Sequence, residues 1–139
     1  MIKQFSLVLL LTLPISLNAE EDNRQFVKLP EMMQNHMMAN MRHHLETINS
    51  ILHLMANKQL DKAADIAEKN LGMTSLKSHN ASHMAKFMPK GMQQTGTSMH
   101  KAASRFALRA QEGDFAEAYK VLGEVTSACV ACHAAYRIR

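Results

Sequence analysis

The stretch Cys129-Val130-Ala131-Cys132-His133 brings two thiols and an imidazole together in the spacing C-x-x-C-H. On a helix each residue advances by about 100°, so both cysteines and the histidine fall within a sector of about 100° on one face. C-x-x-C-H is the attachment sequence of a c-type haem, in which the thiols form thioethers and the histidine binds the iron. The sequence therefore predicts one covalent haem c held by Cys129, Cys132 and His133 at the end of a helix.

Other uses of a cysteine pair fit this sequence less well. A thioredoxin-like C-x-x-C needs a strand that turns into a helix, and no strand pattern precedes Cys129. A structural zinc site needs about four ligands, and the chain has no second cysteine pair. A disulfide between residues three apart on a helix has poor geometry.

The first residues of the chain predict export. Basic Lys3 is followed by a mostly apolar run over residues 5–17 and then by the small residue Ala19. This order is typical of a secretory signal peptide. We expect residues 1–19 to be the signal peptide and residues 20–139 to be a periplasmic domain with no membrane span. An uncleaved anchor is the alternative, although the run is shorter than the about 20 residues of a transmembrane helix.

The cysteine content and the net charge agree with a location outside the cytoplasm. The chain has two cysteines, both in the C-x-x-C-H stretch, as expected for haem attachment outside the cytoplasm. A net charge of +4 could favour an acidic redox partner but is too small to predict nucleic-acid binding.

The composition predicts an all-α fold. Ala, Met, Leu, Lys, Glu and Gln dominate, and all of them favour helices. Amphipathic runs are expected at residues 30–56, 60–71, 98–111 and 115–138. Tight connections at 57–59 and 113–114 and a longer irregular stretch at 73–96 predict an antiparallel four-helix bundle. With 5% aromatic residues and no Trp the core would be thin, and a haem among the helices would fill it.

Spacing also predicts which faces are buried and where helices begin. The inward stripe of the first run is Met37 or Met38, Met41, Leu45, Ile48, Leu52 and Met55. The inward stripe of the fourth is Phe115, Ala118, Leu122, Val125, Cys129, Cys132, His133 and Tyr136. Pro89 and Gly91 are expected to stop a short helix, with Thr97 or Ser98 as the next N-cap. Asp114 and Glu117 resemble a capping box.

The segment from Cys129 to Arg137 resembles the haem segment of the cytochrome c′ and cytochrome c-556 family, class II c-type cytochromes with a C-terminal C-x-x-C-H. The resemblance implies a periplasmic haem protein that carries electrons or binds small gases. It makes Cys129 and Cys132 the thioether anchors, His133 the proximal iron ligand and Arg137 the basic residue near the proximal face. Complementing the helix dipole is the alternative role of Arg137. The family is often dimeric, so a homodimer is a further expectation.

The distal iron ligand decides between the functions that the resemblance implies. In the family an apolar residue of the first helix leaves the iron open, whereas a methionine closes it. The resemblance places Met41 there, with Met37 or Met38 as the fallback. A thioether gives a low-spin iron of raised potential, which suits a single-electron carrier between partner proteins. Met41 as an ordinary core residue is the alternative, and an open iron would favour a binding protein for NO or CO.

The remaining metal-binding side chains suggest smaller possibilities. His79 and His83 could bind a metal as an i, i+4 pair, and His83 could instead be the distal ligand. Met33, His36, Met37 and Met41 form a possible soft Cu(I) site. Arg42 could reach a haem propionate, and the other histidines are expected on helix surfaces. We find no arrangement of catalytic residues and expect no enzymatic activity.

Overall fold

The computed structural model describes residues 21–139, and this part of the chain is mainly helical, which confirms the predicted helical class. The helices are α1 (Glu31–Ala56), α2 (Leu60–Asn70), α3 (Ala81–Met84), α4 (Lys90–Gln111) and α5 (Phe115–Ala135). Two 3₁₀ turns, Met73–Leu76 and Ala85–Phe87, flank the short α3. The predicted signal peptide at residues 1–19 lies outside the described residues.

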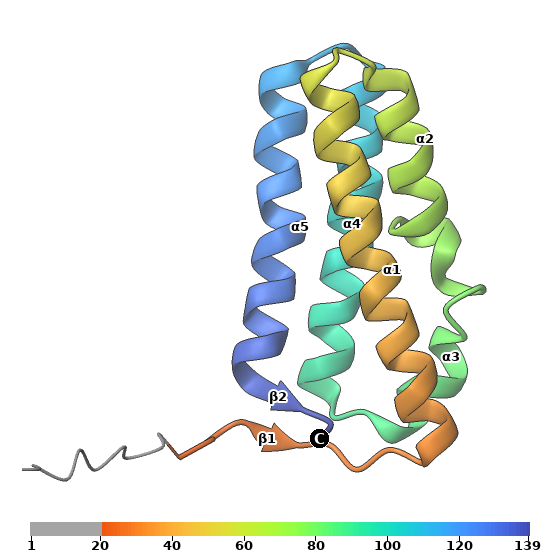
Figure 1. Cartoon of the computed structure of the whole chain (residues 1–139), viewed down its shortest axis with the longest axis vertical. Helices are drawn as coiled ribbons and strands as arrows, with labels where there is room; N and C mark the ends of the chain where they lie inside the picture. The colour runs from red at the N-terminus through yellow and green to blue at the C-terminus, as the bar shows by residue number, and fades with distance from the viewer. Residues whose placement is uncertain (1–20) are drawn as a thin grey trace, which may run out of the picture.

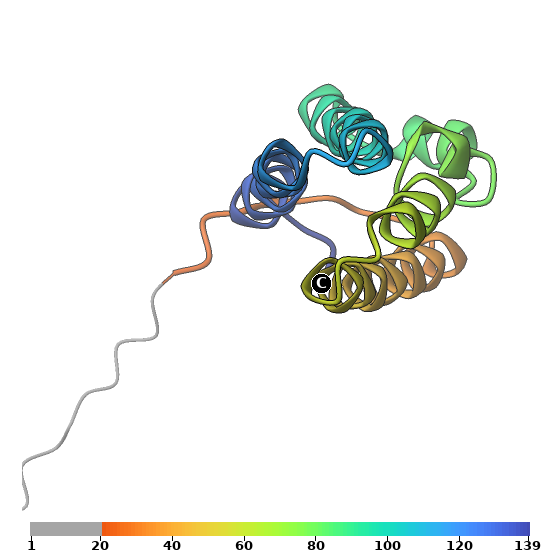
Figure 2. The same cartoon turned by 90° about the horizontal axis from the view of Figure 1, so that it is seen from above.

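The four long helices lie side by side, and each runs opposite to the long helix before it in the chain (Figure 1). α4 packs most extensively against α5, α2 packs against α4, and α1 packs mainly against α2. Viewed from above, α1 and α5 occupy different sides of the group (Figure 2). The helix that carries the C-x-x-C-H stretch is therefore held chiefly by α4.

The hydrophobic core is built largely from alanine. Eight of the sixteen residues in the main buried cluster are alanines, contributed by α2, α4 and α5. Small side chains let helix backbones approach closely, and Phe106 of α4, which is fully buried, supplies the largest apolar side chain there. The core of the described residues is thus built mainly from small side chains, in line with the low aromatic content of the sequence.

Both predicted tight connections are present. Lys58 adopts a left-handed conformation with φ of 58° between α1 and α2, and Gly113 does so with φ of 77° between α4 and α5. A positive φ carries no steric penalty in glycine, which suits Gly113 to end α4. Phe115 was expected to face inward but is 47% exposed, because it begins α5 beside this turn.

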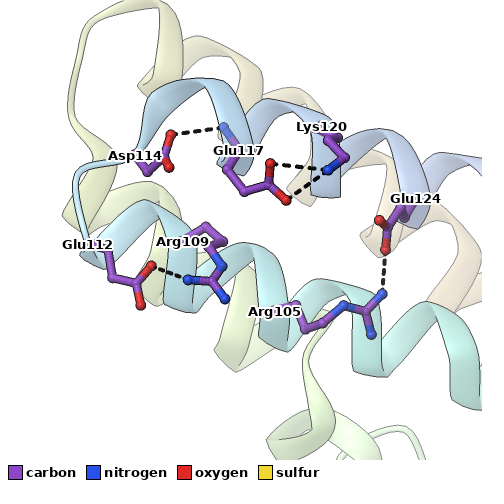
Figure 3. Close-up of polar contacts among 7 residues, drawn as sticks. All are labelled: Arg105, Arg109, Glu112, Asp114, Glu117, Lys120 and Glu124. Carbon is purple, nitrogen blue, oxygen red and sulfur yellow. Dashed lines mark hydrogen bonds and ion pairs between the residues drawn. The ribbon is translucent and has the colours of Figure 1, made fainter.

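Asp114 caps α5, and its removal gives a first prediction. Its Oδ1 accepts a hydrogen bond from the backbone N–H of Glu117 at 3.0 Å (Figure 3). The reciprocal bond of a capping box is not formed, because the Glu117 carboxylate accepts from Lys120 Nζ at 3.1 Å instead. We expect Asp114→Ala to lower the free energy of unfolding by about 1 kcal/mol, measured by urea denaturation.

Glu112→Ala is the matched control for the cap. The Glu112 carboxylate lies in the same connection but makes only an exposed ion pair with Arg109 (Figure 3). Exposed pairs contribute little, so this variant should change stability by about 0.5 kcal/mol or less. Equal effects of the two substitutions would contradict the capping role of Asp114.

The predicted start of α4 at Thr97 or Ser98 is wrong, because the helix begins at Lys90. Pro89 directly precedes it with φ of −56°, and proline favours the first positions of a helix, where a missing N–H costs nothing. Gly91 does not stop a helix but lies in the first turn of α4, where a Cβ would collide with the hydroxyl of Tyr136. Glycine here allows the C-terminal segment to pack closely on α4.

The predicted end of α5 at Ile138 is also wrong. The helix ends at Ala135, and β2 (Tyr136–Arg137) pairs in parallel with β1 (Gln25–Phe26). The N–H of Val27 extends this pairing by donating to the carbonyl of Arg137 at 2.8 Å. The first and last parts of the described chain are thereby joined below the helices (Figure 1).

The buried face of α1 agrees with the predicted stripe at Ile48 and Met55 but differs from it by one residue elsewhere. Leu45 and Leu52 were expected inside but are 69% and 45% exposed, whereas His44 and Thr47 are buried. One residue along a helix is a rotation of about 100°. α1 therefore turns His44 rather than Leu45 toward the interior.

Candidate functional site

Cys129, Cys132 and His133 lie on the last two turns of α5. Cys129 is half-buried against the alanine-rich core, and its thiol donates to the carbonyl of Val125 at 3.3 Å. Cys132 and His133 line a cavity at this end of the molecule. Both cysteines are free, and burial raises the pKa of each thiol, so both are protonated at neutral pH. Cys132 and His133 thus stand beside the cavity, whereas Cys129 packs against the core and is not among the lining residues.

The cavity has a volume of about 350 Å³ and is bounded by α1, α3, α4, the end of α5 and the C-terminal residues. Cofactor pockets typically measure about 300–1,000 Å³ and are mostly apolar. Seven of the 12 methionines of the chain line it. They are Met37, Met38, Met41, Met84, Met88, Met92 and Met99. Such flexible, polarizable side chains suit a large planar apolar group.

The predicted distal methionines of α1 share this cavity with His133. Met37, Met38 and Met41 are each half-buried and line it. The four residues of the possible Cu(I) site are not all gathered there. Met33 is buried outside the cavity lining, and His36 Nε2 lies 3.0 Å from the carbonyl of His79.

Three buried histidines form a second feature of the cavity wall, which we call the histidine cluster: His44, His79 and His100. His44 belongs to α1, His79 to the segment before α3, and His100 to α4. The ring centroids are 4.7 Å apart for His44 and His79, 5.4 Å for His79 and His100, and 6.1 Å for His44 and His100. The expected surface position is wrong for His44 and His100, and His79, considered as a metal ligand with His83, is buried as well.

Hydrogen bonds hold two members of the cluster but leave the third without a partner. His100 Nδ1 donates to the carbonyl of Leu71 at 2.7 Å, and Ser75 Oγ lies 3.3 Å from His79 Nδ1. His44 Nε2 is buried and has no hydrogen-bond partner within the described residues. Leaving a buried polar atom unpaired costs about 1–3 kcal/mol. The unpaired Nε2 of His44 therefore lowers the stability of this arrangement.

The histidine cluster is uncharged at neutral pH. Burial, reinforced by the charge of neighbouring histidines, lowers the pKa of His44 to about 3 and that of His79 to about 4. Burial also lowers the pKa of His100, although the hydrogen bond to Leu71 opposes this shift. All three rings are thus available as neutral imidazoles.

These lowered pKa values predict how stability depends on pH. The unfolded chain takes up protons on its histidines as the pH falls through about 6.5, whereas the buried rings of His44 and His79 stay neutral down to pH 3–4. The unfolded state then binds more protons, so the free energy of unfolding should fall between pH 6.5 and 4. We expect a loss of about 1 kcal/mol per buried histidine over the first unit below 6.5, measured by urea denaturation.

Two variants test the origin of this dependence. His79→Asn keeps a polar group near Ser75 but cannot titrate, and it should flatten the pH profile. His53→Gln changes an exposed histidine of α1 and should leave the profile unaltered. A wild-type stability that is constant from pH 7 to pH 5 would contradict the assignment.

Arg137 lines the cavity from β2, beyond the end of α5. Its guanidinium lies 5.1 Å from the centroid of the Phe26 ring, and its Nε lies 3.5 Å from Asp22 Oδ2. Arg24 also lines the cavity and donates to the carbonyl of His133 at 3.4 Å. Two cations therefore line the cavity together with His133.

Other predicted candidates lie away from this cavity. His83 is exposed and its ring packs against Phe87 at 5.9 Å, so it does not pair with buried His79. Arg42 is exposed on α1. Within residues 21–139, no group of three or more His, Cys, Asp or Glu side chains is arranged to hold a metal ion by itself. Over the same residues, no helix is long and apolar enough to cross a membrane.

Comparisons with known proteins give no relatives: no protein-family model, no curated protein and no solved structure matches this chain.

Proposed function

We propose that this protein is a periplasmic monohaem c-type cytochrome of the four-helix-bundle type that carries single electrons between partner proteins. The observation that carries the proposal is the cavity of about 350 Å³ that joins Cys132 and His133 of α5 to the methionine-rich wall of α1. The donor set fits a haem c, since two free thiols and an imidazole stand in attachment spacing, and Cys132 and His133 line a mainly apolar cavity.

Each part of the site has a role in this proposal. Cys129 and Cys132 would hold the haem through thioethers, and His133 would bind its iron. The bound haem would supply a one-electron couple at its iron. The methionines of the cavity exclude water, which helps to set the potential of a buried redox centre. Arg137, which lines the cavity, would donate to an anionic propionate.

A carrier should keep its iron closed by a second ligand. α1 supplies methionines to the cavity wall, among them Met41, which the sequence predicts for this position. A six-coordinate iron reorganises little on electron transfer and leaves no site for a gas. An open iron would suit NO or CO binding instead.

The visible absorption spectrum of the exported protein, oxidised, reduced and with CO added, tests the proposal. We expect a sharp α band on reduction, no high-spin band, and no change with CO. A haem spectrum that shifts with CO would replace the carrier function by gas binding. A protein without a haem spectrum, produced in cells that mature c-type cytochromes, would contradict the proposal.

A further inference from the structure

The segment of residues 77–88, which contains α3, forms one wall of the cavity and bridges two helices. Its cavity-lining residues are His79, Ala81, Met84 and Met88. On one side, His36 Nε2 of α1 lies 3.0 Å from the carbonyl oxygen of His79. On the other side, the side-chain amide of Gln93 in α4 donates to the carbonyl of Met88 at 2.9 Å. Side chains of α1 and α4 thus hold the two ends of this segment.

The side chain of His79 is the inward contact of the segment. It is 8% exposed, and its ring centroid lies 4.7 Å from that of His44 on α1 and 5.4 Å from that of His100 on α4. Asn80 follows with φ of 53°, a left-handed conformation that asparagine tolerates better than most residues. This turn leads directly into α3. The histidine cluster therefore joins the segment to both helices at one place.

Most titratable groups around the ring of His79 are bases. α1 contributes His36, His43 and His44, and α4 contributes His100. The cavity is also lined by three arginines and three titratable residues near the end of the chain: Arg24, Arg137, Arg139, Cys132, His133 and Tyr136. A proton on His79 would therefore meet repulsion from basic neighbours in addition to the cost of burying a charge.

Two carboxylates lie nearby on α2, but neither pairs with the cluster. Asp65 and Glu68 line a neighbouring pocket together with Lys69 and His79. The carboxylate of Glu68 accepts a hydrogen bond from the backbone N–H of Thr74 at 3.1 Å. Among residues 21–139, no carboxylate forms an ion pair with a ring of the histidine cluster. Protonated rings would therefore have no counter-ion in the closed arrangement.

We infer that residues 77–88 are a lid of the cavity, which the neutral histidine cluster holds closed and which opens when His79 and His100 take up protons. The inference goes beyond the proposed function and does not depend on it, because the contacts that hold the lid do not involve the C-x-x-C-H stretch. Opening moves the ring of His79 into water and away from the rings of α1 and α4. The cavity is then exposed to solvent between these two helices.

The pH range of opening follows from the two states of His79. Burial, reinforced by the neighbouring histidines, lowers its pKa to about 4 in the closed state, whereas a solvated histidine has a pKa of about 6.5. The open state therefore binds more protons between these two values, and opening becomes more favourable as the pH falls. For one such histidine, the open fraction should rise about 20-fold from pH 7 to pH 5.

Amide hydrogen exchange of the exported protein at pH 7 and pH 5, followed peptide by peptide with mass spectrometry, tests the inference. The rates are corrected for the intrinsic pH dependence of amide exchange. The open fraction of residues 81–88 should rise about 20-fold or more at the lower pH, since at least one histidine titrates. Peptides from the middle of α4 and α5 should show a much smaller rise.

Three variants assign this rise to the cluster. His79→Asn keeps a polar side chain near Ser75 but cannot titrate, so it should remove the share of the rise due to His79. His100→Asn should likewise reduce the rise, and it serves if the first variant is poorly folded. His83→Gln changes an exposed histidine of the same segment and is the matched control, which should retain the full rise. A lid that is merely loosened would exchange faster at both pH values with an unchanged ratio.

The inference is overturned if the ratio of open fractions at the two pH values is the same in wild type, His79→Asn and His100→Asn. An equal rise over the lid, α4 and α5 overturns it as well, because the chain then opens as a whole. The absence of a haem spectrum is a separate result, which contradicts the proposed function and leaves the comparison of these ratios unchanged.

Discussion

Replacing Cys129 and Cys132 together by alanine is expected to reduce covalently bound haem from one per chain to none. Each thiol can form one thioether, and the chain has no other cysteine to replace them. His133 could still bind an iron reversibly, but a denaturing acid extraction would then remove the haem. The measurement is the haem that remains with the polypeptide after this extraction, in cells that mature c-type cytochromes.

Val130→Ala is the control for this pair of substitutions. Val130 lies between the two cysteines and is 68% exposed, so its truncation leaves the thiols and the helix in place. It should retain one haem per chain. Covalent haem in the double cysteine variant would contradict the attachment at these residues.

Phe106→Ala is expected to cause the largest loss of stability among single core substitutions. The side chain of Phe106 is fully buried, and many of the side chains in its cluster are alanines, which cannot extend to fill the space left behind. Truncation of a buried phenylalanine costs about 3–5 kcal/mol, and the cost rises with the volume of the cavity that remains. Urea denaturation of the haem-loaded protein should show this loss in the free energy of unfolding.

Phe115→Ala removes the same side chain from a position that is 47% exposed. It should lower the free energy of unfolding by about 0.5 kcal/mol or less, as most surface substitutions do. Similar losses from the two phenylalanine variants would contradict the core described for α4.

The sequence predicted the helices that internal spacing defines well. Met99, Ala103, Phe106 and Ala110 repeat at intervals of three and four, and all four are buried as expected. Gly113 and Asp114 mark a turn and a cap by local chemistry alone, and both have these roles. Local periodicity and capping need no knowledge of the rest of the chain, which is why they could be predicted.

Contacts between distant segments could not be predicted in this way. β1 and β2 pair the two ends of the described chain, and no local pattern marks a two-residue strand. The close approach of Tyr136 to Gly91 likewise depends on where the C-terminal segment returns. Pro89 and Gly91 were expected to stop a helix, but they stand at the start of α4, where proline is favoured and the glycine admits the hydroxyl of Tyr136.

The histidine cluster was missed for a related reason. A helical stripe was chosen by hydrophobicity, so Leu45 was placed inside and His44 outside, whereas α1 has the opposite orientation. His44 packs there against the rings of His79 and His100, so a polar side chain takes the position that hydrophobicity assigned to Leu45. Two positions in the sequence could have indicated these buried histidines. His44 lies one helical turn beyond Met41, and His100 directly follows Met99.

The intact mass of the exported, denatured protein tests the central claim most directly. The account predicts a mass larger than that of the polypeptide by one haem, with the added mass located on a peptide that contains Cys129 and Cys132. A polypeptide of unmodified mass with two titratable thiols, isolated from cells that mature c-type cytochromes, would contradict the account.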